Sequence, residues 1–297
     1  MNLLNINNRI QTSFSDVETP DLILLNVGFA IHHADWNYKN VSSPFARIYL
    51  IHEGTAKVHL LNRTLDLKAG HLYIIPPFTL HTYECDAYFS LFYIHIYENP
   101  SSHHSFFESY IFPSELIAGS LDEMSVKKLC EINPEKGLKE YDPSNYDNSP
   151  TLMRSISLYS QSPASIILET RGLLYLLCSR FLEKAIIKNE ITDGRIIKTI
   201  HYIRTHIEKP LSIEELSEIC YLSKDHFIRL FKKELQQTPV QYINKKKIER
   251  AQLKMITGRQ SVKDIAYELA FNNISYFNRL FKKHTGFCPN EYRKIHS

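Results

Sequence analysis

The clearest hydrophobic pattern in the chain is a seven-residue stretch that occurs twice, fifty residues apart. Residues 227–233 read FIRLFKK and residues 277–283 read FNRLFKK. In both copies the apolar side chains fall at i, i+3 and i+4, on one face of a helix, and Arg and Lys fill the opposite face. Extended over residues 226–242 and 276–292, the two windows share eight of 17 positions without a gap. This repeat predicts one small helical unit present twice.

Helix-start signals flank both copies of the repeat. A Ser, Thr or Asn stands before each apolar helical pattern, where its side chain can accept a hydrogen bond from a free backbone N–H. The predicted caps are Ser212, Ser223, Thr238, Ser261 and Asn273. Short turns at Tyr221 and Ala270 separate the helices of each pair. This order predicts two helix-turn-helix units joined by a long helix that starts at Pro239 and ends near Gly258.

The first third of the chain has a different pattern. Runs rich in Ile, Leu, Val, Tyr and Phe are separated by Gly, Pro and Asn, which is typical of short antiparallel strands in a sandwich or barrel. The predicted strands are Leu22–His33, Ala46–His52, Thr55–Leu61, His71–Ile75 and Ala87–Tyr97.

A helical pattern returns after Pro163. Apolar residues recur at roughly helical spacing as far as Ile186, which predicts a helix over Ala164–Lys188. This apolar stripe is wider than one packing face on a small barrel requires. We therefore expect the 164–188 helix to join two copies of the chain in a homodimer. The alternative is that the helix covers only its own barrel.

Charge divides the chain in two. The 297 residues carry a net charge of +3, with 43% hydrophobic and 23% charged residues, a composition able to build ordinary cores. Residues 194–297 contain 20 Lys or Arg and 10 Asp or Glu, a net +10, which leaves −7 on residues 1–193. A compact basic third favours a polyanion as partner. The alternative is a solvated charged surface.

Cysteine spacing and hydropathy indicate the compartment. The five cysteines are dispersed without a CxxC pair, which suits reduced thiols in a cytosol. The N-terminal residues lack the order of a signal peptide, and the longest apolar runs are too short to cross a bilayer. We expect a cytoplasmic protein without a membrane partner.

The exposed faces of the two repeat helices carry side chains suited to DNA. Arg can form two hydrogen bonds to guanine and Asn can form two to adenine in the major groove, whereas Lys side chains and helix N-termini suit phosphates. The candidates for base readout are Asp225, His226, Ile228 and Arg229 on the first helix and Ser275, Tyr276, Asn278 and Arg279 on the second. The candidates for phosphate contact are Ser223, Lys224, Lys232, Lys233, Asn273, Lys282 and Lys283.

The basic third resembles a known family over its whole length. The stretch 264–268 (DIAYE), Phe277, 281–283 (FKK), Gly286 and 289–293 are similar to the signature of the AraC/XylS DNA-binding domain. The resemblance implies a transcription regulator, usually an activator, with an operator and RNA polymerase as partners. The family usually has Gly in each turn, where Tyr221 and Ala270 stand here. A residue with a side chain in a left-handed turn costs on the order of 1 kcal/mol, so we expect both turns to form with strain.

The strand region resembles the cupin barrels that serve as sensing domains of AraC-type regulators. The resemblance rests on 47–54 (RIYLIHEG), 67–77 (LKAGHLYIIPP) and 81–83 (HTY). Cupin enzymes hold a metal with a His-x-His pair. Here Lys57 stands two residues before His59, where the pair would need a second His, and His81 stands alone. The sequence therefore predicts no metal and no cofactor, and a barrel that binds one small effector. Candidates for contact with that effector are Trp36, Arg47, Tyr49, His81, Tyr83, Tyr93 and His95.

The sequence thus predicts an α+β multidomain protein. Its parts are an N-terminal cupin-like β-barrel, a helical connector and a C-terminal all-α domain with two helix-turn-helix motifs. The expected boundaries are an arm over 1–20, the ligand-sensing barrel over 21–100, the connector and dimerisation region over 101–193 and the DNA-binding domain over 194–297. We expect a non-enzymatic, ligand-controlled transcription regulator. The alternatives are a metal-dependent cupin enzyme fused to a DNA-binding domain, and an RNA or architectural DNA binder.

Overall fold

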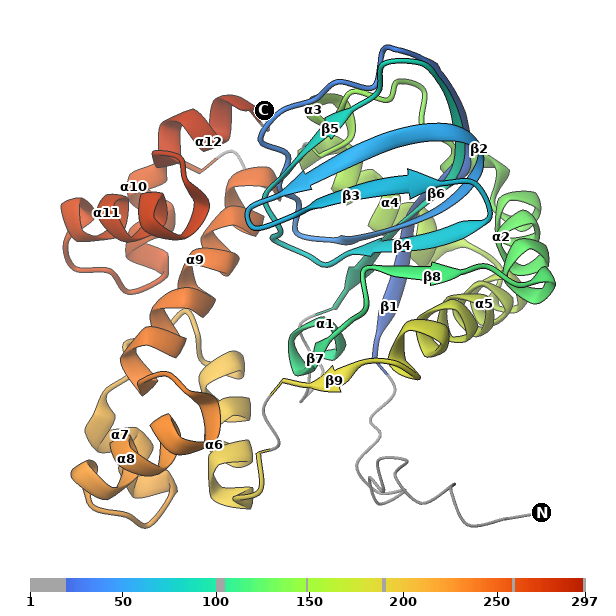
Figure 1. The fold of residues 1–297 in the computed structure, drawn as a ribbon. Helices are drawn as coiled ribbons and strands as arrows, with labels where there is room; N and C mark the ends of the chain where they lie inside the picture. Colours follow the sequence, from blue (N-terminus) through green and yellow to red (C-terminus); the bar gives the residue numbers. More distant parts are fainter. Residues whose placement is uncertain (1–19, 100–104, 148, 189–190, 258–259, 296–297) are drawn as a thin grey trace, which may run out of the picture.

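The computed structural model describes residues 20–99, 105–147, 149–188, 191–257 and 260–295. The predicted N-terminal arm lies outside these residues except for Pro20. The N-terminal half is built on a sheet, and the C-terminal third is helical throughout (Figure 1). The predicted class, a sheet domain followed by an all-α domain, is confirmed.

The sheet is antiparallel and contains seven strands. Five strands follow the order β1-β6-β2-β4-β8, and β3 and β5 both pair with the second half of β2. The strands are β1 (Leu22–His33), β2 (Ala46–Leu60), β3 (Thr64–Lys68), β4 (His71–Ile75), β5 (His81–Glu84), β6 (Tyr88–Glu98) and β8 (Glu115–Ile117). Among the described residues no pairing joins the edge strands β1 and β8, so the sheet is open where a closed barrel was predicted. It also extends to β8, past the predicted domain boundary at residue 100.

The two strands predicted at 46–52 and 55–61 are one strand, β2. Gly54 takes a left-handed φ of 76°, and the register with β6 shifts between Ile51 and Glu53. A Cβ at Gly54 would lie 2.1 Å from the backbone oxygen of Tyr88, so only glycine fits this approach. The glycine read as a turn signal therefore marks a bulge, which bends β2 and lets it pair with two sets of strands.

The connector covers one face of the sheet with helices. Its elements are α1 (Phe106–Ser109), β7 (Tyr110–Ile111), α2 (Ser120–Ile132), the 3-10 helix η1 (Pro134–Lys136), α3 (Pro143–Tyr146), α4 (Ser149–Gln161), α5 (Ala164–Leu182) and β9 (Ile186–Ile187). The predicted 164–188 helix is too long, because the chain turns after Leu182 and β9 pairs with β7. Leu174, Leu177 and Phe181 of α5 are buried against the sheet, so much of the apolar stripe packs within its own domain.

The C-terminal third forms two helix-turn-helix units at the two ends of one long helix, as predicted (Figure 1). Its helices are α6 (Gly194–Thr205), α7 (Ile213–Ile219), α8 (Lys224–Leu235), α9 (Pro239–Thr257), α10 (Val262–Glu268), α11 (Ile274–Thr285) and α12 (Pro289–Ile295). Phe227 and Phe231 are fully buried in the first unit, and Phe277 and Phe281 are fully buried in the second. The apolar repeat positions are thus the cores of the two units.

The second unit and the sheet domain share one hydrophobic core. Ile23 and Phe45 of the sheet half belong to the same buried cluster as Ile248 and Met255 of α9 and Phe277 of α11. Helix α4 packs against both β1 and α9. The long helix α9 is therefore fixed on the sheet domain near its C-terminal end.

Candidate functional site

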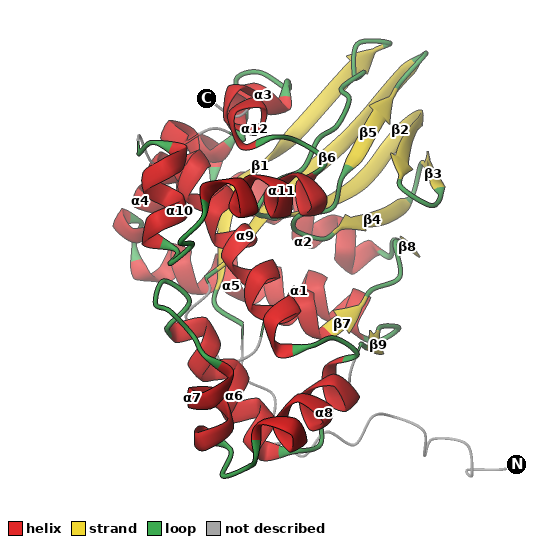
Figure 2. Ribbon diagram, turned by 90° about the vertical axis from the view of Figure 1, so that its left-hand side faces the viewer, coloured by secondary structure: helices red, strands yellow, loops and turns green. Residues whose placement is uncertain are grey.

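Helices α8 and α11 present their predicted reading side chains outward. Seven of the eight base-readout candidates are exposed, and Ile228 is half-buried. The seven phosphate candidates are exposed as well. Both helices lie on the side of the molecule that faces the viewer in Figure 2. The buried Phe faces fix each helix so that its Arg-bearing face meets solvent.

The helix starts follow the predicted chemistry with one exception. The side chain of Asn273 accepts from the backbone N–H of Tyr276 at 2.9 Å. Ser261 forms a reciprocal capping box with Asp264, and Thr238 exchanges hydrogen bonds with Gln241. The predicted side-chain cap at Ser223 is wrong, since its hydroxyl makes no capping bond. The first turn of α8 therefore lacks a side-chain acceptor of the kind that Asn273 gives to the backbone N–H of Tyr276 in α11.

Both helix-turn-helix turns adopt the backbone that the sequence predicts. Tyr221 and Ala270 each have φ of 54°, in the left-handed region that favours glycine. The Tyr221 side chain is 94% exposed, so no burial compensates for this conformation. The two units repeat the same strained turn.

The lysine side chains of α8 and α11 differ in whether they form ion pairs. Lys224 forms an ion pair with Glu214 of α7. Among the described residues, no ion pair involves the other four lysines predicted to contact phosphate, Lys232, Lys233, Lys282 and Lys283. These four ammonium groups are available to an external anion. Tyr276 differs from the other reading candidates, because its hydroxyl accepts a hydrogen bond from Asn244 of α9 at 2.9 Å.

The seven predicted effector contacts lie together in the sheet interior. All are buried: Trp36, Arg47, Tyr49, His81, Tyr83, Tyr93 and His95. The Trp36 ring stacks on Tyr83 with 4.0 Å between centroids. The Tyr83 hydroxyl shares hydrogen bonds with the Tyr49 hydroxyl at 2.6 Å and with Nε2 of His81 at 2.8 Å. Burial lowers the pKa of His81 to about 3, so this imidazole is neutral at pH 7.

The charged residue of this interior, Arg47, is already paired within the chain. Its Nη2 donates to Asp147 at 2.9 Å and to Ser43 at 2.6 Å, and the side chains of Arg47 and Asp147 are each 1% exposed. The Tyr93 hydroxyl accepts from the backbone N–H of Leu138 at 2.7 Å. Connector residues thus occupy the polar groups that the sequence assigned to an effector. Whether an effector contacts these side chains stays a prediction.

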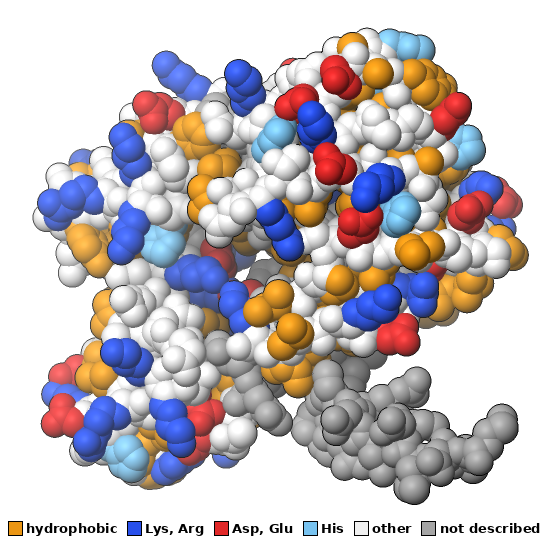
Figure 3. Space-filling model, in the orientation of Figure 1, with side chains coloured by type: hydrophobic (Ala, Val, Ile, Leu, Met, Phe, Trp, Pro, Cys, Tyr) orange, Lys and Arg blue, Asp and Glu red, His pale blue; other side chains and the backbone are white. Residues whose placement is uncertain are grey.

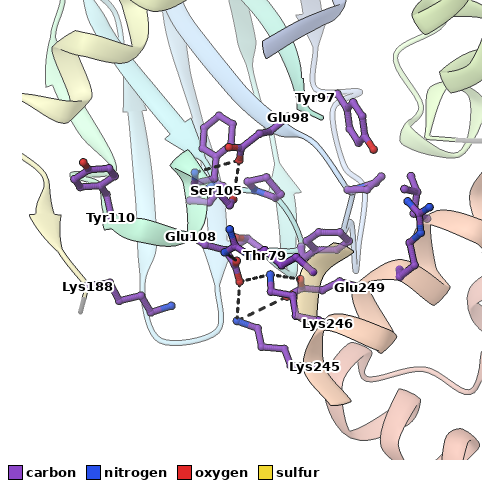
Figure 4. Close-up of a pocket in the computed structure, with 18 of the residues that line it drawn as sticks. Thr79, Tyr97, Glu98, Ser105, Glu108, Tyr110, Lys188, Lys245, Lys246 and Glu249 are labelled. Atoms are coloured by element: carbon purple, nitrogen blue, oxygen red, sulfur yellow. Dashed lines mark hydrogen bonds and ion pairs between the residues drawn. The ribbon is translucent and has the colours of Figure 1, made fainter. Parts of the chain in front are cut away.

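A cavity of about 1000 Å³ lies elsewhere, between the sheet domain and the DNA-binding domain. None of the seven predicted effector contacts lines it. One wall comes from β4, α1 and β7, and the other comes from α6 and α9 (Figure 4). The apolar lining includes Ile74, Ile75, Pro76, Phe107 and Phe112. Figure 3 shows Lys and Arg side chains around the hollow between the two lobes.

One end of this cavity holds a buried cluster of charges. The carboxylate of Glu108, on α1, accepts from Nη2 of Arg204 at 2.7 Å and forms ion pairs with Lys245 and Lys246 of α9 (Figure 4). Glu249 lies 2.8 Å from Nζ of Lys246. Burial alone would raise the pKa of Glu108, but the three cations hold it below its usual value. The cluster joins the sheet domain to α6 and α9 through ionised groups.

Sequence patterns did not identify this cluster. Its members are far apart along the chain, at positions 108, 204, 245, 246 and 249. The nearest signal is the run of three lysines at 245–247 on the long helix, which by itself indicates no carboxylate partner. Only the packing of α1 against α6 and α9 brings the charges together.

The described residues contain no group of three or more His, Cys, Asp or Glu side chains placed to hold a metal ion. Within the same residues, no helix is both long enough and apolar enough to span a membrane.

Two family models match the chain. Residues 26–176 match an AraC-like ligand binding domain, and residues 216–295 match a helix-turn-helix domain. The chain is 29% identical to the xylose operon regulatory protein of Escherichia coli K12 over 107 residues, 36% of this chain and 27% of that protein. It is 36% identical to the MmsAB operon regulatory protein of Pseudomonas aeruginosa over 93 residues, 31% of this chain and 30% of that protein. The chain thus spans less than a third of the length of these curated relatives.

Solved structures resemble the chain at two scales. Unsaturated fatty acid bound wild-type ToxT from Vibrio cholerae has a TM-score of 0.49 and 16% identity, with 94% of this chain and 97% of that chain covered. The DNA-binding domain of AdpA, in complex with a target DNA, has a TM-score of 0.33 and 22% identity, with 34% of this chain and 92% of that chain covered.

Proposed function

The chain belongs to the AraC/XylS family of transcription regulators, and we propose from this premise that it recognises a specific operator through α8 and α11 and responds to a small effector. The observation that carries the proposal is that α8 and α11 each expose one face and bury two Phe side chains at the same repeat positions. Each presents a helix face with an exposed Arg, while its Phe residues are fully buried. Such a face fits the major groove, where the four base pairs differ in their hydrogen-bonding groups.

The two helices support an asymmetric binding site for each monomer. Arg229 and Arg279 occupy the same place in the repeat, but Ile228 is replaced by Asn278 and His226 by Tyr276. The four lysines that form no ion pair with the described residues lie at the ends of these helices. They supply the phosphate contacts that fix the position of the protein along the duplex. Two units of this kind read two successive major grooves about 34 Å apart on one face of the duplex.

Control of transcription follows from the same domain arrangement. The sheet domain senses the effector, and α9 transmits its state to both reading helices, since α9 contacts the sheet domain and joins the two units. We propose activation through contact with RNA polymerase in the cytoplasm. We also propose a homodimer formed through the outer face of α2 and α5.

The experiment that tests DNA recognition starts from a pool of random duplexes. The full-length protein should select one motif made of two different tracts about ten base pairs apart. Its affinity for that motif should exceed its affinity for random duplex by about a thousandfold at physiological salt. Equal affinity for selected duplex, random duplex and double-stranded RNA would contradict sequence-specific regulation and favour an architectural binder.

A further inference from the structure

The interdomain cavity carries an excess of positive charge. Its lining includes seven Lys or Arg side chains, namely Arg63, Lys188, Arg204, Lys209, Lys245, Lys246 and Arg250. Four carboxylates face the same space, namely Glu98, Glu108, Glu208 and Glu249. Glu98 is largely buried, and burial raises its pKa, while hydrogen bonds from Ser105, Phe106 and Phe107 act in the opposite direction. The residues that line the cavity therefore include three more cationic than anionic side chains.

Lys188 shows where the excess lies. It follows β9 at the cavity edge, and its side chain points toward the ion pair of Glu108 and Lys245 (Figure 4). Among the described residues it forms no ion pair. Burial, followed by repulsion from Lys245, lowers its pKa. An anion placed beside Lys188 would offset both effects, because an opposite charge favours the charged form of the ammonium group.

The rest of the cavity is suited to an apolar body. Ile74 and Ile75 at the end of β4, and Pro76 after it, line the same wall as Phe107 and Phe112. A volume of about 1000 Å³ is at the upper end of the usual range for small-molecule sites. Apolar walls with a few convergent charges at one end favour a ligand that has a charged head and an apolar body.

We propose that this cavity is an effector site for a small organic anion with a doubly charged oxyanion head, as in a phosphate monoester, and an apolar body. The head lies among Lys188, Lys245 and Arg204, beside Glu108. Glu108 is the resident carboxylate of these cations, so it weakens binding of the anion by like-charge repulsion. The inference rests on the proposed function, in which an effector controls the DNA-binding domain.

The same cations lie one contact away from both reading helices. Nε of Arg204 donates to the Tyr242 hydroxyl at 3.1 Å, and the Tyr242 ring packs against Phe231 of α8 with 5.8 Å between centroids. Asn244, the residue before Lys245, donates to the Tyr276 hydroxyl of α11 at 2.9 Å. An anion at this end of the cavity therefore acts on the turn of α9 that contacts α8 and α11. The geometry gives the ligand a physical route to DNA affinity.

The test uses full-length protein and four probes. Phenyl phosphate, benzoate and benzyl alcohol share one ring and differ in head-group charge, and inorganic phosphate lacks the ring. Calorimetric titration and thermal unfolding should give phenyl phosphate the highest affinity, then benzoate, with no measurable binding of benzyl alcohol. Equal binding of phenyl phosphate and benzyl alcohol would overturn the charged head, and equal binding of phenyl phosphate and inorganic phosphate would overturn the apolar body.

Two variants test the residues. Lys188→Gln should weaken phenyl phosphate binding about tenfold, the loss expected for one charge-assisted contact. Glu108→Gln should tighten it, which a purely structural role for Glu108 would not produce. Lys39→Gln, at an exposed lysine outside the cavity, is the matched control and should leave affinity unchanged. Unchanged affinity in Lys188→Gln would overturn the site, and because Lys188 forms no ion pair with the described residues this variant should fold normally.

Regulation is measured separately from binding. Saturating phenyl phosphate should change operator affinity of the wild-type protein at least about threefold, and Lys188→Gln should need about ten times more phenyl phosphate for the same change. Unaltered operator affinity in the wild type would overturn the effector role. Loss of operator recognition without any ligand would instead refute the proposed function, while the cavity titration would still stand.

Discussion

At the residue scale, the two repeat copies separate scaffold from recognition. Positions that agree between the copies include the buried Phe, Pro and Tyr residues, for example Phe227 and Phe277. Positions that differ include the half-buried Ile228 against the exposed Asn278. Arg229 and Arg279 occupy the same place and are both exposed, so the two units share one exposed donor group and differ in the side chains around it. Substitutions on the exposed face should therefore change recognition without changing the fold.

Arg279 and Lys282 should affect DNA binding in different ways. Arg279→Ala removes a side chain that we expect to donate two hydrogen bonds to one base. The free energy of binding to the selected site should therefore weaken by about 1–3 kcal/mol, and the base preference at one position should relax. Lys282→Ala removes a phosphate contact, so it should weaken all duplexes alike and reduce the salt dependence of binding by about one ion. Affinities measured on the selected site and its single-base variants, over a salt series, separate the two effects. Equal losses on all sequences for both variants would contradict these roles.

At the element scale, the helix-turn-helix units were predictable because their signals are local. Caps such as Ser261 and Asn273 lie within one turn of the helices that they start, and the structure has both bonds. The turn strain at Ala270 was also predictable from one position. The sheet was less so, since β3 and β5 are short and depend on their pairing with β2. Local periodicity contains no information about such partners.

The end of α5 and the cation cluster at Glu108 depend on contacts distant in sequence. Helical spacing continues as far as Ile186, yet Ile186 and Ile187 pair with Tyr110 and Ile111 as strand β9. The candidates for effector contact are all buried, and connector residues hydrogen-bond two of them, Arg47 and Tyr93. The cavity is formed by two domains, so neither domain's sequence pattern alone could indicate it.

The left-handed turn of the second unit gives a stability prediction. Ala270→Gly removes a side chain from φ of 54° and should stabilise the protein by about 0.5–1 kcal/mol, because the strain exceeds the added entropy of the unfolded chain. Ala251→Gly, in the middle of α9, is the matched control and should destabilise it, because helical Ala is favoured there. Urea unfolding followed by circular dichroism measures both. Destabilisation by Ala270→Gly would show that the turn is unstrained.

At the scale of the whole molecule, the DNA-binding lobe and the helices α2 and α5 lie on opposite sides of the sheet (Figure 1). The side that carries α2 and α5 is also where several exposed apolar side chains occur, namely Ile117, Leu121, Met124 and Leu168. Joining two copies there leaves both pairs of reading helices facing outward. This arrangement agrees with a dimer that binds two operator sites, one for each monomer.

Disruption of the proposed dimer interface should lower the molecular mass measured in solution. The double variant Leu121→Lys with Met124→Lys should convert the wild-type dimer to a monomer in light scattering, since each buried apolar side chain contributes about 1.5–3 kcal/mol and a buried Lys opposes contact. Leu61→Lys, at a leucine that is 88% exposed in the turn after β2, is the matched control and should remain dimeric. The monomer should still bind one operator site, because its reading helices and their cores are intact, but it should lose cooperativity between two sites. A wild-type protein that is monomeric at micromolar concentration, or a double variant that remains dimeric, would refute this interface and leave the DNA-binding prediction unaffected.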